Sequence, residues 1–433
     1  MSADTTVREQ KTMISKTRAE AFGNAKWIAL AILCVTYFLQ QGTRQIYNAT
    51  LPQIKADFLA GGVSDVQLGV IGSVFSLVYG VVVPFAGVAA DLFGRKRIVV
   101  LALLLFSTGI CASGFAGGLG MLLAMYGVLA AVGQCMFPSP ATSLIAQLHP
   151  KTRATALSIF QGSLYLGIVA CSCAAGWLGG LGEGGWRTAF WIFGAAGLLW
   201  VPAVVFGLKE PPAASVDGGT DAKPSAGEAL LAMVRKPSAV MLTLGFGMCM
   251  YGSKAFFTWM PAFFQKSFPS LSPAAAAFHA VFWFYCGAFA GISCASRVTD
   301  RLAGGRPGVR MEANVLGLAL CAPFAFLAAR APSVTLCCAA LALWGFAHGV
   351  YDSNFFASLY DVVAPRYRAA ATGAFLCGGF VIGSFSPAVL GWMSQHLSIR
   401  DGFASLAAFY LAGAAAILVA RVVFLKRDLN PQH

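Results

Sequence analysis

Twelve long apolar runs dominate this sequence, and they limit its fold more than any other feature. Each run is close to the roughly 20 residues that a helix needs to cross the hydrocarbon core of a bilayer, or longer. With 58% hydrophobic and 11% charged residues among 433, the composition excludes a soluble domain. A membrane barrel would show short alternating segments instead. The predicted spans are residues 26–50, 66–90, 97–116, 119–147, 153–180, 186–207, 238–265, 274–298, 311–330, 333–361, 367–395 and 400–425.

The connections between the runs differ in charge. Most of the 30 Lys and Arg residues lie in the two tails and in every second connection. Basic loops remain on the cytoplasmic side of a membrane, so both termini are predicted to be cytoplasmic. The net charge of +13 therefore indicates loop orientation, and we expect no nucleic-acid partner. We expect a multi-pass protein of the bacterial inner (cell) membrane, in contact with the lipid bilayer.

The two halves of the chain repeat each other. Residues 149–157 after the fourth run read HPKTRATAL, and residues 364–372 after the tenth read APRYRAAAT. Duplication of a six-span unit is typical of transporters with two related bundles. The predicted organisation is a cytoplasmic tail at 1–25, a six-helix bundle at 26–208, a cytoplasmic linker at 209–237, a second bundle at 238–425 and a cytoplasmic tail at 426–433.

Three ionisable residues lie well inside the predicted spans: Arg44, Lys254 and Asp352. A charge at such depth costs about 2.5–3.5 kcal/mol on insertion scales, so it needs a partner or a wet cavity. Lys254 can pair with Asp352, and that pairing leaves Arg44 uncompensated. Its planar guanidinium can hold a carboxylate or phosphate at two points. This favours anion binding by Arg44 over the alternative in which the charges only neutralise each other.

Asp352 has two interpretations, a fixed counter-ion or a group that takes up a proton during transport. His348 lies one turn earlier on the same helical face, where it either packs or relays a proton. Polar residues on matching stripes complete the predicted binding site, and each of them alone is more often a packing residue. The further candidates are Gln40, Gln41, Tyr47, Asn48, Gln134, Gln161, Tyr165, Tyr251, Trp259, Tyr351 and Asn354.

A loop motif lies between the second and third spans, where residues 87–97 read GVAADLFGRKR. It combines glycines for close packing and a tight turn with an acidic residue and a basic cluster. Its residues are Gly87, Asp91, Gly94, Arg95, Lys96 and Arg97. A degraded copy, SRVTDRLAGGR, follows the eighth span and carries Asp300 and Arg306.

This motif resembles the loop motif of the major facilitator superfamily, Gly-x-x-x-Asp-x-x-Gly-Arg-Arg/Lys. The resemblance covers the whole chain, with twelve spans, a central linker, repeated halves and the motif in the matching loop. It implies an all-α polytopic membrane protein in which two pseudo-symmetric six-helix bundles rock around a central cavity. In that family the motif gates the cytoplasmic side and does not bind substrate.

Two subfamilies share features with this chain. Arg44 ahead of Leu51–Pro52, and GQCMFPSP at 133–140, look like the organophosphate:phosphate antiporters. YGSKAFFTWMP at 251–261 and GGWRTAF at 184–190 look more like the anion:cation symporters. The symporters carry Arg and Glu in the fourth span, where this chain has Tyr126 and Gln134. The antiporters carry a second Arg in the seventh span, about one position from Lys254.

These observations predict a secondary active transporter, not an enzyme, for a small organic anion such as a carboxylate or phosphate ester. Coupling is expected through protons or a counter-anion, with no cofactor or metal, in a monomer. One rival is an exporter of amphipathic or cationic compounds with Asp352 as the cation or proton site. A rival of another class is a nutrient receptor in a transporter fold. The plain tails and short linker contain no signalling domain, which weighs against the receptor.

Overall fold

The computed structural model of the chain describes residues 3–58, 61–149, 152–208, 234–303, 308–364 and 367–428. Arg306 and residues 209–233 of the predicted linker lie outside these ranges. The described segments are helices joined by short turns, and none of them forms a strand. Only helices and closed barrels satisfy their backbone polar groups inside lipid, so this is the all-α membrane architecture that the apolar runs predict.

The first half contains six predicted spans. Its helices are α1 (Ala3–Asp57), α2 (Asp65–Phe93), α3 (Arg95–Ser113), α4 (Leu119–Leu122), η2 (Leu123–Ala130), α5 (Ala131–Met136), α6 (Pro138–Leu148), α7 (Arg153–Gly179) and α8 (Gly185–Gly207). The second half repeats this arrangement. Its helices are α10 (Pro237–Ser267), α11 (Pro273–Ala303), α12 (Val309–Arg330), α13 (Val334–Asp352), α14 (Phe355–Val362), α15 (Arg368–Ser384), α16 (Ser386–His396), α17 (Ile399–Val419), η4 (Ala420–Phe424) and α18 (Leu425–Asp428).

Eleven of the predicted spans coincide with helical segments that are long and apolar enough to cross a membrane. The remaining span lies within α1, which begins at Ala3 and is therefore much longer than the predicted 26–50. Polar side chains in its second half, among them Gln40, Gln41, Arg44 and Asn48, lower the hydropathy of α1. The helix that is least apolar is thus the one that carries Arg44.

Two spans are interrupted at equivalent places in the two halves. The fourth span changes from α5 to α6 at Phe137, and the tenth changes from α13 to α14 at Ser353 and Asn354. Pro138 at the start of α6 has no backbone N–H. The first residues of a helix need no such donor, so proline favours a helix start there. In the tenth span, the break places Asp352 at the last residue of α13, where the turn leaves its side chain one-third exposed.

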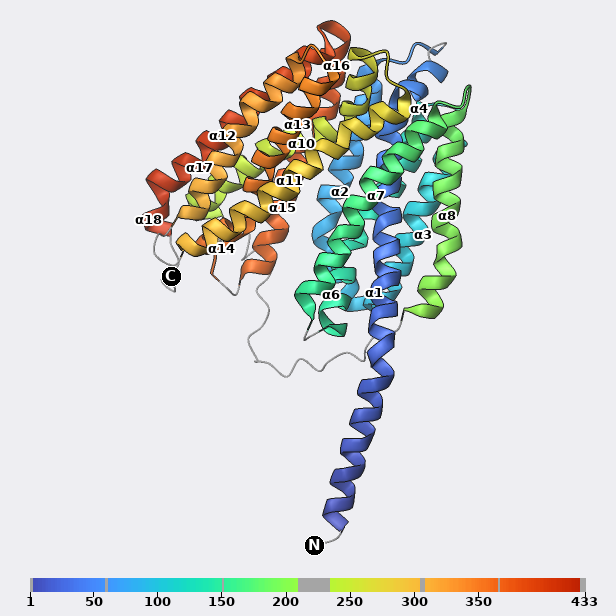
Figure 1. The fold of residues 1–433 in the computed structure, drawn as a ribbon, viewed down its shortest axis with the longest axis vertical. Helices are drawn as coiled ribbons and strands as arrows, with labels where there is room; N and C mark the ends of the chain where they lie inside the picture. The colour runs from blue at the N-terminus through green and yellow to red at the C-terminus, as the bar shows by residue number, and fades with distance from the viewer. Residues whose placement is uncertain are drawn as a thin grey trace.

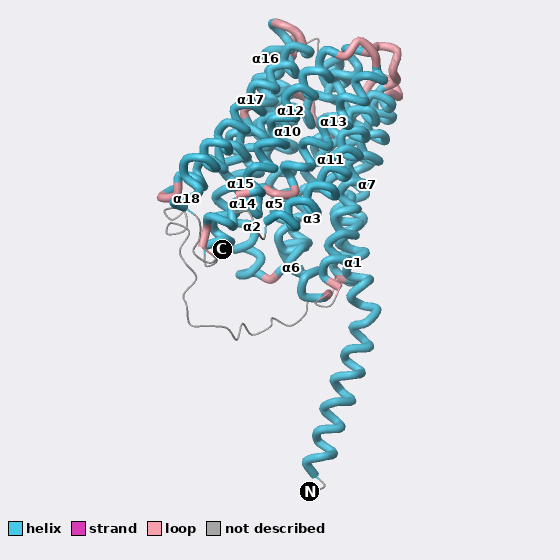
Figure 2. Tube along the Cα trace, turned by 60° about the vertical axis from the view of Figure 1, so that its left-hand side comes forward, coloured by secondary structure: helices cyan, strands magenta, loops and turns pink. Residues whose placement is uncertain are grey.

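The two halves diverge along their length (Figure 1), and Figure 2 shows from another direction how far α1 projects beyond the bundle. We call the end from which α1 projects the tail face, and the opposite end the loop face. Polar contacts between the halves gather at the loop face. Lys266 of α10 lies 2.8 Å from the nearly fully buried Asp65 of α2, and Ser394 of α16 donates to the same carboxylate at 2.9 Å.

Close backbone packing reinforces the contact at the loop face. A Cβ on Gly69 of α2 would lie 2.3 Å from the carbonyl oxygen of Pro387, so a larger residue does not fit there. On the other side of the bundle, Gly176 of α7 is packed as tightly against Pro273 of α11. The halves therefore meet closely at the loop face.

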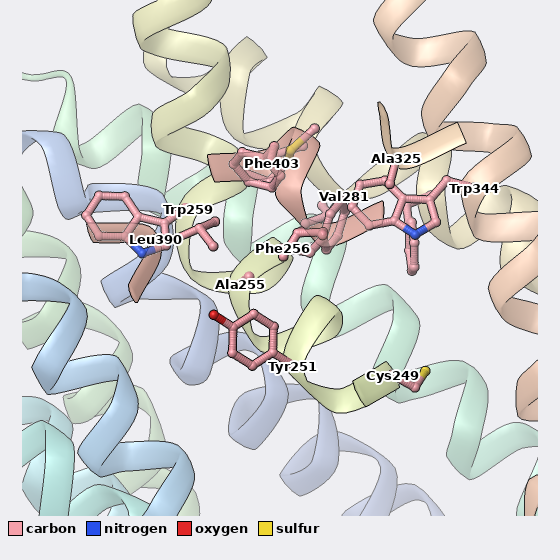
Figure 3. Close-up of a cluster of buried hydrophobic side chains, with 14 of the residues drawn as sticks. Cys249, Tyr251, Ala255, Phe256, Trp259, Val281, Ala325, Trp344, Leu390 and Phe403 are labelled. Atoms are coloured by element: carbon pink, nitrogen blue, oxygen red, sulfur yellow. The ribbon is translucent and has the colours of Figure 1, made fainter. Parts of the chain in front are cut away.

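Aromatic residues around α10 form the largest part of the core in the second half. Phe256 contacts Phe284 at 4.4 Å and Trp344 at 5.2 Å between ring centroids. Figure 3 shows this cluster, with Cys249, Tyr251 and Trp259 projecting from the same helix. This packing holds α10 rigidly, which matters because α10 also carries Ser253 and Lys254.

Candidate functional site

The polar stripe of α1 is tied to the fourth span. Nε2 of Gln40 donates to the carbonyl oxygen of Gln134 at 2.5 Å, and Nε2 of Gln134 donates to Oγ1 of Thr43 at 3.3 Å. Gln41 in turn donates to Oε1 of Gln40 at 3.1 Å. The structure thus brings together three of the predicted residues beside Arg44. Their mutual hydrogen bonds hold α1 in one orientation.

Arg44 points at aromatic rings, not at an acid. Its guanidinium carbon lies 5.3 Å from the centroid of Phe75 and 5.4 Å from that of Tyr79, both on α2. The Tyr126 hydroxyl donates to the backbone carbonyl of Arg44 at 3.2 Å. Within the described part of the chain, the guanidinium makes no ion pair. Such cation–π contacts contribute about 0.5–2 kcal/mol, less than a desolvated charge needs for full compensation.

Lys254 has the same kind of surroundings. Its Nζ lies 4.2 Å from the centroid of Phe380 on α15 and 5.9 Å from that of Tyr79. The residue is buried, with 6% of its surface exposed. Among the described residues, it has no acidic partner, and it interacts electrostatically with Arg44.

A pair of rings joins these two cations across the two halves. Tyr79 of α2 and Phe380 of α15 stack with their centroids 5.1 Å apart. Gly80 permits this approach, because a Cβ there would lie 2.4 Å from Cβ of Phe380. Arg44 and Tyr79 come from the first half, Lys254 and Phe380 from the second. We call these four residues the two-cation site.

Asp352 is held by its own helix. Its Oδ2 lies 3.1 Å from Nδ1 of His348, and Nε2 of His348 lies 3.0 Å from Oγ of Ser253 on α10. His348 also contacts the Cys249 sulfur at 3.5 Å and the Phe284 ring at 5.4 Å. The predicted pair between Lys254 and Asp352 does not form among the described residues. The reason is that His348, one turn before Asp352, lies closer, while Lys254 extends over Phe380.

The donors and acceptors around His348 allow two hydrogen-bonded arrangements that differ by one proton. The Ser253 hydroxyl has one hydrogen and two acceptors, since the Cys249 carbonyl oxygen also lies 3.0 Å away. When it donates to the Cys249 carbonyl oxygen and Nε2 of His348 donates to Ser253 Oγ, the His348–Asp352 pair is neutral overall. When it donates to Nε2, the pair has one proton fewer and is negative. One proton thus changes both the charge and the hydrogen-bond direction.

The sequence also matches the model of a known protein family. Residues 33–311, more than half of the chain, match the family model described as Major Facilitator Superfamily. The chain belongs to the Major Facilitator Superfamily. It is therefore a membrane transporter and not an enzyme, as the loop motif and the repeated halves predict.

Known members of the Major Facilitator Superfamily resemble the chain over nearly its full length. The cis,cis-muconate transport protein of Acinetobacter baylyi is 25% identical, with 97% of this chain and 100% of the relative covered. An MFS-type efflux pump of Mycolicibacterium smegmatis is 28% identical, with 92% and 91% covered. The crystal structure of a bacterial homolog of the human lysosomal transporter spinster superposes with a TM-score of 0.82 at 21% identity, covering 94% of this chain and 99% of that one.

The remaining predicted site residues of this facilitator divide by exposure. Gln161 and Tyr165 of α7 are accessible, and Tyr165 contacts the Tyr285 ring of α11 at 5.3 Å. Tyr47 and Trp259 are fully enclosed, and each donates to a backbone carbonyl, Tyr47 to Leu68 and Trp259 to Pro387. Tyr47 and Trp259 therefore pack in this conformation, and their role in binding stays a prediction.

Four further candidates are also held by neighbours. Tyr251 stacks on Phe409 at 3.8 Å, and Tyr351 stacks on Phe355 at 5.7 Å. The Asn354 amide donates to Ser353 Oγ at 2.7 Å and to the Val350 carbonyl at 3.2 Å, within the turn that ends α13. Asn48 likewise donates to Gln45 at 3.2 Å on its own helix. These contacts maintain the helices around the site.

The facilitator loop motif lies at the tail face, far along α2 from the two-cation site. Gly94 has φ of 91° and joins α2 to α3, which is the tight turn that the motif predicts. Arg97 is exposed, Arg95 and Lys96 are partly buried, and Gly87 faces Ser139 of α6. The Asp91 side chain and Arg306 lie outside what the structure describes. In the degraded copy, Asp300 lies 3.9 Å from Arg310, which also binds Asp361 at 2.9 Å.

Sequence reasoning missed Phe75, Phe380 and Ser253. The two rings carry no signal of their own, because the chain has 34 phenylalanines and most of them pack. Ser253 lies directly before Lys254, so its position next to a predicted charge was a usable signal. Spacing within one helix shows that His348 and Asp352 share a face, but it does not show that Ser253 of another helix reaches them.

Proposed function

We propose that this facilitator carries small organic anions, carboxylates or phosphate esters, across the membrane by alternating access. The observation that carries the proposal is Arg44, a partly buried residue whose guanidinium lies beside aromatic rings and has no acidic partner among the described residues. A carboxylate or phosphate would supply the missing charge and both hydrogen-bond acceptors. The similarity to a muconate transport protein supports an anionic substrate.

The proposed orientation places the tail face in the cytoplasm of a bacterial cell, because the basic loops lie there. Access to Arg44 would then be from the cytoplasm in this conformation. Exchange of the contacts at the loop face for contacts at the tail face would open the site to the outside. Binding in either state would move the equilibrium only as far as the ligand prefers that state.

We further propose that His348 and Asp352 couple transport to protons, with exchange against a second anion as the other mode of coupling. The donor count at Ser253 supports proton coupling, because the pair has two hydrogen-bonded states that differ by one proton. Asp352 also lies within electrostatic range of Tyr165 and Tyr285, which face the same region. A proton taken up there would change the charge close to the substrate.

Uptake by proteoliposomes tests the role of Arg44. Arg44→Gln should lower the uptake of organic anions at least tenfold, because one charge-assisted contact of about 1.5 kcal/mol or more is lost. Arg44→Lys should retain part of the activity, since it keeps the charge and loses the planar fork. Arg235→Gln, at an exposed position just before α10 and outside the loop motif, is the matched control for removal of one positive charge. Uptake by Arg44→Gln at the wild-type rate would contradict the proposal.

An applied pH gradient separates the two modes of coupling. Proton symport predicts uptake that accelerates with an inward proton gradient, and Asp352→Asn should abolish that acceleration while counterflow continues. Exchange predicts that preloaded anion, not the gradient, accelerates uptake in both proteins. Acceleration by the gradient that persists unchanged in Asp352→Asn would exclude Asp352 as the proton site.

The second candidate is export of amphipathic or cationic compounds, which the similarity to an efflux pump favours. In that case Asp352, whose side chain is one-third exposed, would bind the cation. The two cations near Tyr79 speak against it, because they would repel a cationic ligand from the same space. Protection of cells against lipophilic cations that depends on Asp352 but not on Arg44 would favour the exporter.

A further inference from the structure

We propose that the ligand of the two-cation site is a dianion, with one acidic group at Arg44 and the other at Lys254, joined by a short flat apolar linker. This inference rests on the proposed function, because it requires that the chain transports organic anions at all. It narrows that function to a substrate class, organic acids with two ionised groups at opposite ends.

The charges at the site carry the first step. Arg44 and Lys254 both lie among aromatic rings, and neither has an acidic partner within the described residues. Asp352 does not compensate Lys254, because its carboxylate is engaged by His348 at 3.1 Å. In the protonated state, the His348–Asp352 pair is neutral, so two positive charges remain beside Tyr79. One carboxylate would neutralise only half of that charge.

The position of the cations carries the second step. Arg44 lies about two turns before Pro52 in α1, and Lys254 lies about two turns before Pro261 in α10, the first helix of the second half. The two cations thus occupy nearly equivalent places in the two repeats. A pseudo-symmetric site with one cation from each repeat matches a ligand with similar groups at both ends.

The surface between the cations carries the third step. Arg44 lies 5.4 Å and Lys254 5.9 Å from the centroid of the same ring, that of Tyr79. Phe380 continues this aromatic surface at 5.1 Å from Tyr79. Flat π-faces favour planar, weakly polar groups, whereas a linker with many hydroxyls would find few partners there. An unsaturated linker meets this condition better than a saturated one.

Two negative charges would also act on the halves themselves. Like charges on α1 and α10 repel each other at close range, and this repulsion opposes closer approach of the halves around the ligand. A dianion removes the repulsion and bridges the two bundles, while a monoanion leaves one positive charge behind. The proposal therefore predicts that dianions drive occlusion and that matched monoanions do so weakly.

Matched acids test the inference in purified full-length carrier, with binding measured by calorimetry and by thermal stability at pH 7.5. The probes are 2,4-hexadienedioate against 2,4-hexadienoate and fumarate against crotonate, where each pair shares a chain and differs by one carboxylate. Adipate serves as the saturated counterpart of the longer dianion. In the wild type, at least one dianion should bind about tenfold or more tightly than its monoanion partner.

Substitutions at Lys254 identify the second group. Lys254→Gln should reduce the preference for the dianion to less than about threefold and leave monoanion binding nearly unchanged. Lys254→Arg should keep the preference for the dianion. Its elution profile and Tm serve as the check that position 254 tolerates substitution. Equal binding of dianions and monoanions by the wild type would overturn the inference, as would full preference in a folded Lys254→Gln. In both cases the proposed function would stand.

Failure of the proposed function has a different signature. In that case no carboxylate of either class, and no phosphate ester added to the panel, would stabilise the wild type or bind to it. Arg44→Gln also distinguishes failure of the proposed function from failure of the dianion inference, because it should weaken the binding of dianions and of monoanions alike. A result in which monoanions bind tightly and depend on Arg44 would support anion transport and exclude the dianion.

Discussion

Ser253 carries no charge, yet its hydroxyl determines how the charged groups of the second half are connected. It accepts from, or donates to, Nε2 of His348, and through that ring it reaches Asp352. In sequence it lies next to Lys254. A single turn of α10 thus holds both a cation for the proposed anion and one end of the proposed proton site. The proposed substrate site and the proposed proton site therefore meet at two neighbouring residues, Lys254 and Ser253.

Replacement of Ser253 tests this connection. Ser253→Ala removes an acceptor that binds the protonated imidazole more strongly than the neutral one, because charge-assisted hydrogen bonds are stronger. Proton uptake should then need a higher proton concentration, and half-maximal uptake should shift to lower pH, by about half a unit to one unit for about 1 kcal/mol.

The control for this prediction is Ser253→Thr, which retains the hydroxyl and should retain the pH profile. Ser238→Ala, on the same helix near the tail face, should also leave the profile unchanged. Anion binding at fixed low pH should differ little among the three variants. A pH profile of Ser253→Ala that equals the wild type would show that His348 does not depend on this hydroxyl.

At the scale of elements, α2 and α10 bear most of the contact between the halves. Asp65 at the first residue of α2 is 2% exposed and has three partners, Lys55 at 2.7 Å, Lys266 at 2.8 Å and Ser394 at 2.9 Å. Two of these partners come from the other half. Loss of the Asp65 charge should cost less than the about 3–5 kcal/mol of a fully buried pair, because Lys55 is 31% and Lys266 38% exposed and water can solvate them. Asp65 therefore stabilises the conformation that is closed at the loop face.

Asp65→Asn should shift the conformational equilibrium toward opening at the loop face. The expected measurement is a longer distance between spin labels on the loop-face ends of α2 and α10, or faster labelling of a cysteine placed there. Asp57→Asn is the matched control, because Asp57 pairs with Arg187 at 2.7 Å on the same face but within one half. Equal distances in wild type and Asp65→Asn would assign the contact to folding alone.

The whole molecule was largely predictable from the sequence, because bilayer thickness imposes a length on every apolar run. The even spacing of the runs, the repeat after the fourth and tenth spans, and the loop motif predicted the two-bundle fold. The length of α1 was not predicted, since residues 3–25 are polar and carry no hydropathy signal. The interruptions in the fourth and tenth spans were also missed, although Pro138 and Pro140 in the fourth span and the polar Asp352, Ser353 and Asn354 in the tenth were usable signals.

The site was predictable only in part. Counting charges within the spans identified Arg44, Lys254 and Asp352, because such charges are costly and therefore few. Their pairing was not predictable, since it depends on which of two nearby groups reaches Asp352 first in space. His348 does so from the preceding turn of the same helix. The polar side chains of Tyr47 and Trp259 were uninformative for a similar reason, because tertiary packing decides whether they face a cavity or a backbone carbonyl.

The absence of an acidic partner for Arg44 and Lys254 among the described residues has a consequence for energetics in a living cell. An empty carrier with two uncompensated positive charges moves those charges through the membrane's electric field when access switches from one side to the other. One elementary charge that crosses the whole field changes the free energy by about 2.3 kcal/mol per 100 mV. A carrier loaded with a dianion is electrically neutral at the site, so the free energy of its change of access does not include this contribution from the voltage. Membrane voltage would therefore act on the return of the empty carrier and leave the loaded step almost untouched.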